Sequence, residues 1–397
     1  HEILKVQLMR GEKEQDYLTH IWNLTSMMDH PIIAKEENQD EACYRQFYEE
    51  AISLCRKKRF HEVLEKCRYT SLDDEEEYSI DVIQPEKIEF KQNSYEDGEN
   101  SIISFPEFLL LVLDVCTGGE QPASHYQPDK LIEKFNALKT HFTAGEFYEK
   151  MLYYRLLLDY YTIRRDIKDG QGNYSLILKG PKDDNDKLKQ YQSMLYVSTE
   201  AFYNWLKPYL RKLEQDELQS CAEMLAFLKK EDNERHGVLP SRKDLSYKAS
   251  GNIRYWFWRL DYYLWEQRST FFNEEEQKIV EHYVFRRNRS IEHLHPQDES
   301  HNEEWEEEAV HSFGNLAMIS QSFNSQQSND HIQIKFARIH EQISNKSLQS
   351  IKMFLMCKLA DFNYQNWTMK LAKEHEDKMI ELLKQSYVCD IILSGPS

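Results

Sequence analysis

Apolar residues recur at helical spacing along most of this chain, and that periodicity restricts the fold to a mainly α-helical class. Near the N-terminus the spacing is seen at Ile3, Leu4, Val6 and Leu8, and a longer run of the same kind covers residues 147–163. Helices are therefore predicted in both places, and most of the chain is expected to form a helical scaffold.

A third helical stretch, YWFWRLDYYLWEQR at residues 255–268, is rich in aromatic residues. Aromatic side chains beside Arg259 and Arg268 could serve as a platform on which bases stack. A helix that is apolar all round, however, is typical of a protein core. The sequence favours core packing here.

The chain has 397 residues, more than a single hydrophobic core usually spans. An acidic stretch with turn residues at about 70–100 indicates a loop or weak boundary, and the character of the sequence changes again after residue 280. Three domains are predicted, at residues 1–95, 96–278 and 279–397.

The charge balance is acidic, with 50 Lys and Arg against 68 Asp and Glu and a formal net charge of -18. This is the wrong sign for a protein that coats nucleic acid non-specifically. A local basic strip or a bound metal could still supply a positive field at a site. The composition therefore argues against broad nucleic-acid coating but not against a nucleic-acid enzyme.

Seven scattered cysteines without a C-x-x-C pair favour buried thiols in a reducing cytosol. The longest apolar run, residues 108–115, is too short to span a bilayer, so no membrane partner is expected. The chain opens at His1 in what reads as the middle of a helix. We therefore expect a soluble, cytoplasmic fragment of a longer protein.

Residues able to carry chemistry gather after residue 280. The stretch HYVFRRNRSIEHLHPQ places Arg289 just before Glu292, His293 and His295. If residues 291–296 form a strand, His293 and His295 share one face and Glu292 the other, unless the strand bends or ends there. GNLAMIS predicts a second strand and HIQIKFARIHEQI a helix, which gives the order strand, strand, helix.

These residue types suit hydrolysis of a phosphodiester. The reaction needs a base for water and a divalent cation to offset charge on the phosphate. A histidine with a pKa near about 6.5 suits the first task. Mg²⁺ prefers carboxylate and amide oxygens, which Glu292 and either Asn315 or Asn324 could supply.

Two stretches, IEHLHPQ and SFGNLAMISQSFNSQQSND, resemble the HNH, or ββα-metal (His-Me finger), nuclease module at the C-terminus of GmrSD-type restriction endonucleases. The family has an E/D-H-x-x-P strand, then a G-N-L strand, then an asparagine with S-N shortly after. The nine-residue step from Asn315 to Asn324 also resembles the HNH domain of RNA-guided Cas nucleases. The resemblance implies a small nuclease domain with flanking helices after the helical scaffold.

For residues that match the family's motifs, the resemblance also implies roles in the site. It implies Glu292 as a metal ligand and His293 as the general base. It implies Asn315 as the residue that orients the base and its loop, and Asn324 as the second metal ligand. Lys335 matches a family lysine that touches phosphate.

The N-terminal part resembles the same family more loosely. HEILKVQLMRG is similar to a helix of the family's N-terminal domain, and several later helices resemble those between its two active domains. The D-G-Q-Q-R type motif linked to nucleotide hydrolysis has no counterpart. The resemblance implies the nuclease half alone, with any nucleotide bound through a missing N-terminal region.

Some residues depart from the family pattern. His295 stands where the family usually has an apolar residue, and an acidic insert at 298–308 separates the two strands. Arg289 and His295 join Lys335 as candidate contacts to DNA phosphate. His311 and His331 are expected to be exposed or structural residues rather than ligands.

The predicted function is a DNA endonuclease that depends on Mg²⁺ or Mn²⁺ and restricts foreign DNA, such as phage DNA and modified DNA. The competing hypothesis is a helical module that binds nucleic acid or protein and carries a degenerate nuclease-like domain. Asparagines commonly serve turns, so the polar residues near 292 could also form an ordinary loop. The sequence leaves the oligomeric state open.

Overall fold

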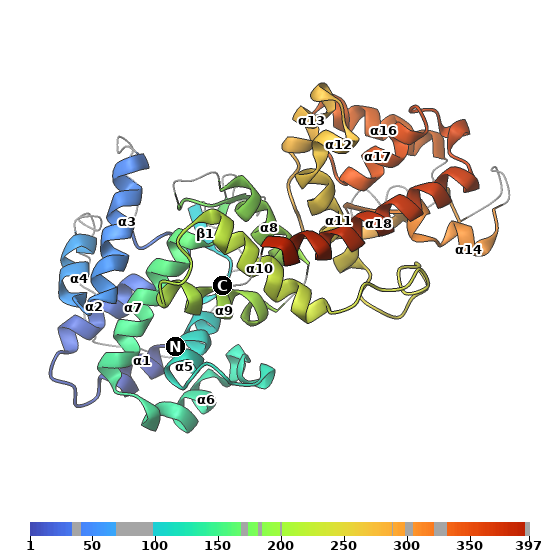
Figure 1. The fold of residues 1–397 in the computed structure, drawn as a ribbon. Coiled ribbons are helices and arrows are strands. Elements are labelled where there is room, and N and C mark those ends of the chain that lie inside the picture. Colours follow the sequence, from blue (N-terminus) through green and yellow to red (C-terminus); the bar gives the residue numbers. More distant parts are fainter. Residues whose placement is uncertain are drawn as a thin grey trace, which may run out of the picture. The chain divides into compact units, whose positions relative to one another are not determined.

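The computed structural model describes residues 1–33, 41–68, 98–167, 174–181, 185–198, 201–287, 289–297, 305–320 and 332–393. Helices make up most of these residues (Figure 1), which confirms the prediction of a mainly α fold. None of the helices in these ranges combines the length and the apolar character needed to cross a membrane.

The chain divides into two compact units that interleave along the sequence. The first unit comprises His1–Asn185 and Ala201–Cys221, and the second comprises Asp186–Glu200 and Ala222–Ser397. The three continuous domains expected from composition stay a prediction. Each unit is described below by itself.

The first unit is a group of helices with one small sheet. Its α-helices are α1 (Glu2–Met9), α2 (Gln15–Ser26), α3 (Glu41–Arg56), α4 (Phe60–Arg68), α5 (Phe105–Cys116), α6 (Leu131–Leu138), α7 (Ala144–Tyr161) and α9 (Phe202–Glu214). Its antiparallel sheet has the order β1 (Gly98–Ser101), β2 (Arg164–Ile167), β3 (Tyr174–Ile177).

Helix α7 is the central helix of the first unit. It begins at a capping box, in which Thr143 accepts from the Glu146 backbone nitrogen at 3.2 Å and the Glu146 carboxylate accepts from the Thr143 nitrogen at 2.8 Å. Every side chain from Met151 to Tyr160 is buried, and α7 packs against α2, α3 and α5. The helix predicted from residues 147–163 is confirmed as a core element.

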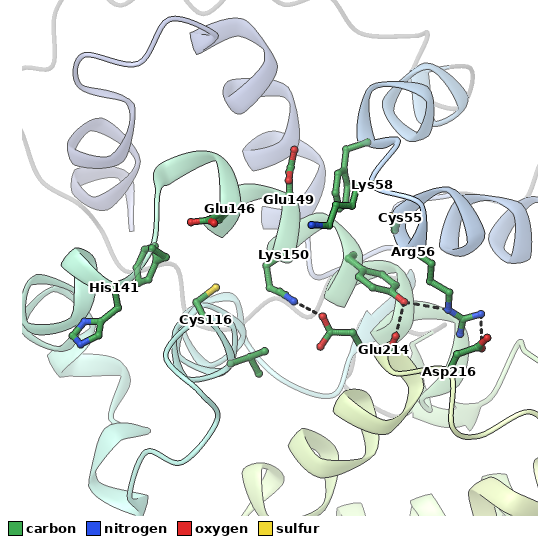
Figure 2. Close-up of a pocket in the computed structure, with 14 residues that line it drawn as sticks. Cys55, Arg56, Lys58, Cys116, His141, Glu146, Glu149, Lys150, Glu214 and Asp216 are labelled. Carbon is green, nitrogen blue, oxygen red and sulfur yellow. Dashed lines mark hydrogen bonds and ion pairs between the residues drawn. The ribbon is translucent and has the colours of Figure 1, made fainter.

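A hollow of about 710 Å³ lies beside α7 in the first unit (Figure 2). Charged side chains of both signs line it. Lys150 forms an ion pair with Glu214, and Arg56 forms another with Asp216 at 2.6 Å. Much of the charge at this hollow is therefore already paired within the protein.

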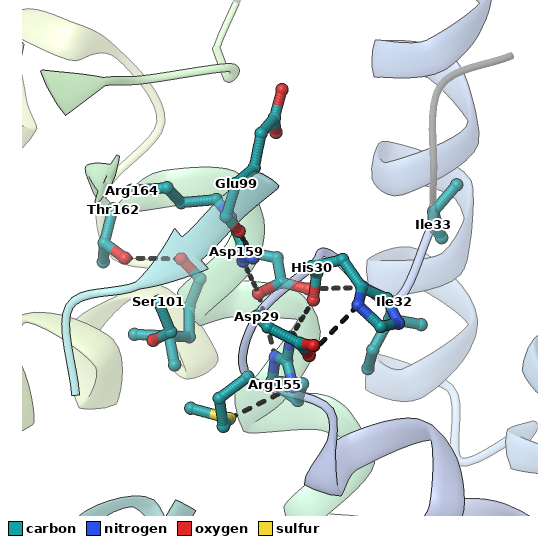
Figure 3. Close-up of polar contacts among 12 residues, drawn as sticks. Asp29, His30, Ile32, Ile33, Glu99, Ser101, Arg155, Asp159, Thr162 and Arg164 are labelled. Carbon is teal, nitrogen blue, oxygen red and sulfur yellow. Dashed lines mark hydrogen bonds and ion pairs between the residues drawn. The ribbon is translucent and has the colours of Figure 1, made fainter. Parts of the chain in front are cut away.

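A buried ion cluster joins α7 to its neighbours (Figure 3). Asp159 accepts from Arg155 at 2.9 Å, from Arg164, and from the Ile32 backbone nitrogen at 2.7 Å. Arg155 also donates to the His30 carbonyl at 2.6 Å, and Arg164 donates to the Glu99 carbonyl at 2.9 Å. The cluster thus ties the segment after α2 and strand β1 to one helix.

The second unit contains the predicted site. Its α-helices are α8 (Asp186–Val197), α10 (Cys221–His236), α11 (Arg254–Glu266), α12 (Arg268–Phe271), α13 (Glu274–Glu281), α14 (Glu307–Val310), α16 (Ile332–Ser344), α17 (Ile351–Leu359) and α18 (Met369–Leu393). Its strands β4 (Arg289–His293) and β5 (Leu316–Ser320) pair antiparallel.

Helix α11 forms the core of the second unit. Each side chain from Tyr255 to Trp265 is buried, and the helix packs against α8, α17 and α18. Its Arg259 is fully buried and lies 3.1 Å from the Asp232 carboxylate, which also accepts from Tyr191 and Tyr255. The aromatic residues of this stretch therefore serve packing, as the sequence favoured, and do not form an exposed platform.

Strands β4 and β5 place the sequence motifs side by side. Their register sets Glu292 opposite Ala317 and His293 opposite Leu316. Helix α16 follows β5, so both predicted strands and the predicted helix are present, with the short helix α14 between the strands in sequence. Because β4 ends at His293, His295 lies beyond the strand and the expected sharing of one face with His293 does not arise.

Candidate functional site

His293 lies at the end of β4 and is 5% exposed. Its Nε2 lies 3.1 Å from Nδ1 of His311, and the amide nitrogen of Gln297 lies 2.9 Å from its Nδ1 and 3.2 Å from its Nε2. The Tyr247 ring packs against the His293 ring, with centroids 4.6 Å apart at 65°. Both ring nitrogens of the candidate base are thus in contact with protein groups.

The surroundings keep His293 neutral. Burial, followed by the nearby His311 and Lys335, lowers the pKa of His293 from its ordinary 6.5 to about 3. Burial also lowers the pKa of His311, with Lys248 acting in the same direction. A neutral imidazole has a lone pair that can accept a proton. A pKa of about 3 nevertheless makes His293 a weak base in these surroundings, since a general base works best with a pKa near the operating pH.

Asn315 fixes the chain just after His293. Its side-chain oxygen accepts from the His295 nitrogen at 2.8 Å, and its amide nitrogen donates to the carbonyls of His295 at 3.0 Å and Val310 at 2.9 Å. Its backbone carbonyl accepts from the Leu294 nitrogen at 2.9 Å. Asn315 therefore holds residues 294–295 by both its side chain and its main chain.

A buried lysine supports the turn that carries Asn315. Lys352 of α17 is fully buried, and its ammonium group donates to the carbonyls of Phe313 at 2.8 Å and Leu316 at 2.6 Å. These carbonyls flank Asn315 in the 3-10 helix η4 (Phe313–Asn315) and the start of β5. Sequence reasoning missed Lys352, although a lysine inside the apolar run IKMFLMC is a signal of a buried role.

Gly314 in this turn allows a close approach to α18. A Cβ atom added at Gly314 would lie 2.2 Å from the Ala372 carbonyl oxygen and 2.9 Å from Cβ of Glu376. Backbone atoms cannot yield at that distance. The glycine of the G-N-L motif is therefore required for η4 to reach α18.

Glu292 is paired with Lys335. Both side chains are buried, at 7% and 3% exposed, and they form an ion pair. The Lys335 ammonium also donates to the His293 carbonyl at 2.5 Å. Lys335, expected from the resemblance to contact phosphate, thus lies in the interior and links α16 to the end of β4.

Of the two predicted metal ligands, Glu292 is the one that the structure describes. Glu292 offers the carboxylate oxygens that Mg²⁺ and Mn²⁺ prefer. In this structure the positive charge beside that carboxylate is the ammonium group of Lys335. Asn324 lies outside the described residues. Within the described ranges no group of three His, Cys, Asp or Glu side chains could hold a metal. Among the described residues, Glu292 is therefore a single carboxylate that Lys335 already neutralises, and the metal site stays a prediction.

The two remaining candidate phosphate contacts are buried. Arg289 is 7% exposed at the start of β4, and burial lowers the pKa of its guanidinium. His295 is 4% exposed and stacks on Trp305, with ring centroids 4.1 Å apart and planes at 4°. The structure therefore gives neither residue a surface position. His331 and most of the acidic insert, 298–304, lie outside the described residues.

The structure brings together several residues that no motif signalled. Tyr247 packs against His293 and His311, and its backbone nitrogen donates to the His311 carbonyl at 3.0 Å. His311, expected to be exposed or structural, is in hydrogen-bond contact with the candidate base. These residues lie far from the E-H-x-x-P motif in sequence, so local patterns could not reveal them.

Comparison with known proteins identifies the segment that contains this site. Residues 240–382 match the family model of the GmrSD restriction endonucleases, C-terminal domain. No significant match was found among curated proteins or among solved structures. The match includes both strands and the helix of the motif, as the sequence resemblance led us to expect. The match supports a GmrSD-type restriction endonuclease C-terminal domain over residues 240–382 of this chain.

Proposed function

We propose that this chain is a DNA endonuclease that hydrolyses phosphodiester bonds with a divalent metal, Mg²⁺ or Mn²⁺, and with His293 as general base. The family of residues 240–382 indicates a restriction endonuclease-type nuclease. The observation that carries the finer proposal is the hold of Asn315 on residues 294–295, directly after a neutral, buried His293.

The described side chains have distinct roles in this proposal. His293 accepts the proton of the attacking water, and Asn315 keeps the His293 loop in place. Glu292, together with Asn324, would hold the cation, which when bound offsets charge on the phosphate and the leaving oxygen. Since Lys335 is now paired with Glu292, loading of the metal includes a rearrangement of that ion pair.

Cleavage of plasmid DNA by the purified full chain tests the proposal. We expect nicking with Mg²⁺ or Mn²⁺ and none after chelation of the metal. His293→Ala should lower the rate by about 10²- to 10⁴-fold, the usual contribution of general acid–base catalysis. His340→Ala, which changes an exposed histidine of α16, is the matched control and should cleave at the wild-type rate. Full activity in His293→Ala would show that His293 is not the general base.

A second function is favoured by the contacts of the same residues. Both ring nitrogens of His293 and the carboxylate of Glu292 contact protein groups, as they would in a module that binds nucleic acid without cutting it. Retention of DNA in a gel shift, without cleavage of unmodified or modified DNA under any metal, would support this second function.

We further propose that the biological substrate is foreign DNA, such as phage DNA, met in the bacterial cytoplasm. The support is the restriction-endonuclease family of residues 240–382. Plaque counts on cells that express the full-length protein or its His293→Ala variant test the role. Equal plaque counts for both proteins and for empty cells would refute it.

A further inference from the structure

The contact between His293 and His311 joins two residues that are far apart in sequence. The nitrogens lie 3.1 Å apart, and the two ring planes meet at 75°. His311 directly follows α14, whereas His293 ends β4. No motif of the sequence assigned a function to His311.

The hydrogen-bond pattern lets His311 determine where His293 carries its proton. A neutral imidazole has one N–H and one lone pair. The Gln297 amide nitrogen lies 2.9 Å from Nδ1 and 3.2 Å from Nε2 of His293, so it does not distinguish the two nitrogens, whereas His311 contacts Nε2. When Nδ1 of His311 accepts, the His293 N–H is at Nε2; when it donates, Nε2 of His293 accepts and the N–H is at Nδ1. In both cases, whether Nδ1 of His311 donates or accepts determines which nitrogen of His293 bears the N–H.

Gln297 and His311 differ in how firmly they are held. Gln297 is exposed, so it can turn away without disturbing packed side chains. The His311 carbonyl accepts from the Tyr247 nitrogen at 3.0 Å and from the Ser246 hydroxyl at 3.1 Å. The Tyr247 ring stacks on the His311 ring at 5.7 Å and 14°. His311 is therefore the fixed partner of His293.

The charged groups around this pair are themselves paired. Lys248, next to Tyr247, forms an ion pair with Glu307 on α14, one helical turn before His311. On the other side, Lys335 of α16 is paired with Glu292. Each cation at the histidine pair thus has a carboxylate partner, and hydrogen bonding rather than a net charge orients the two rings.

We propose that His311 is a positioning residue of the nuclease site, which holds the His293 ring through Nε2 and fixes the nitrogen that bears the N–H. This inference rests on the proposed function. When DNA binds, the exposed Gln297 gives way while His311 keeps its contact, so Nδ1 of His293 faces the water that loses a proton. In that state Nε2 donates to His311, and the lone pair is on Nδ1.

Variants at His311 test this role in the full chain. His311→Ala should lower kcat by up to about 10²-fold with an unchanged KM, because misplacement of a catalytic group costs rate without weakening binding. His311→Asn puts an amide group near the place of Nδ1 and should restore most of the rate. Wild-type cleavage by His311→Ala, or no recovery in a folded His311→Asn, would overturn the proposal.

A spectroscopic measurement without DNA separates this inference from the proposed function. The imidazole nitrogen shifts of His293, read by NMR from the histidine-labelled chain and assigned with His293→Gln, report its tautomer. We expect them to change in His311→Ala and to return toward wild type in His311→Asn. Unchanged shifts would refute the contact. If wild-type protein fails to cleave DNA, the proposed function fails, but the shifts still decide whether His311 positions His293.

Discussion

The side chain of Asn315 uses both ends of its amide, and few residues could replace it. The oxygen accepts from the His295 nitrogen and from the Trp367 indole, while the nitrogen donates to two carbonyls. An aspartate has the same shape but only acceptors. The difference between the two side chains is therefore confined to two hydrogen bonds and one charge.

Asn315→Asp should destabilise the second unit by about 3 kcal/mol or more, because a buried carboxylate would face the carbonyls of His295 and Val310. Urea unfolding of the full chain measures the loss. Asn363→Asp is the matched control, since Asn363 only accepts from the Gln365 nitrogen at 3.1 Å, which an aspartate can also do. Equal stability of the two variants would contradict the account of Asn315.

His375 gives a second prediction at the level of a residue, on pH. It is 1% exposed, and burial, then Lys352 and Lys378, lowers its pKa well below 6.5. As the pH falls below 6.5 the unfolded chain takes up a proton on His375 and the folded chain does not. This group's contribution to the free energy of unfolding therefore falls on acidification, by up to about 1.4 kcal/mol per pH unit.

His375→Leu should flatten the dependence of the free energy of unfolding on pH between about 6.5 and 5. Urea unfolding at several pH values measures the slope. Leu382→Ala removes a buried side chain of the same helix, α18, and should lower stability equally at each pH. A His375→Leu slope equal to that of wild type would show that His375 does not contribute.

At the level of elements, α17 acts as a support for the turn between α14 and β5. Lys352 reaches from the first turn of α17 to two carbonyls of that turn, and its own backbone nitrogen donates to Asp261 of α11 at 2.8 Å. Three elements thus meet at one residue, through both its side chain and its backbone nitrogen.

Lys352→Met keeps the length of the side chain but removes its donors. The carbonyls of Phe313 and Leu316 would each lose a buried partner, at about 1–3 kcal/mol per group. The urea midpoint of the full chain should fall accordingly. Lys358→Met, on the same helix, removes a partly buried ion pair with Glu276 and a hydrogen bond to the Phe271 carbonyl, and should cost about 1 kcal/mol. A smaller loss in Lys352→Met than in Lys358→Met would refute the supporting role.

Across the whole molecule, the sequence predicted what is local and missed what is brought together by folding. The strands and α16 were predictable because their spacing and turn residues lie within short stretches. Lys335 was expected to contact phosphate because the resemblance aligned it with a family lysine, whereas its ion pair with Glu292 depends on how α16 packs. Tyr247 and His311 approach the site from separate segments, which no local pattern could indicate, whereas the apolar run around Lys352 was a local signal of its burial.

The chain passes from one compact unit to the other at three points, after Asn185, Glu200 and Cys221. A segment cut to the family match at residues 240–382 would therefore omit α8 and α10. Arg259 would then be buried without Asp232, its carboxylate partner. The segment that matches the family model is therefore smaller than the compact unit that contains it, and the part left out includes α8, α10 and the end of α18.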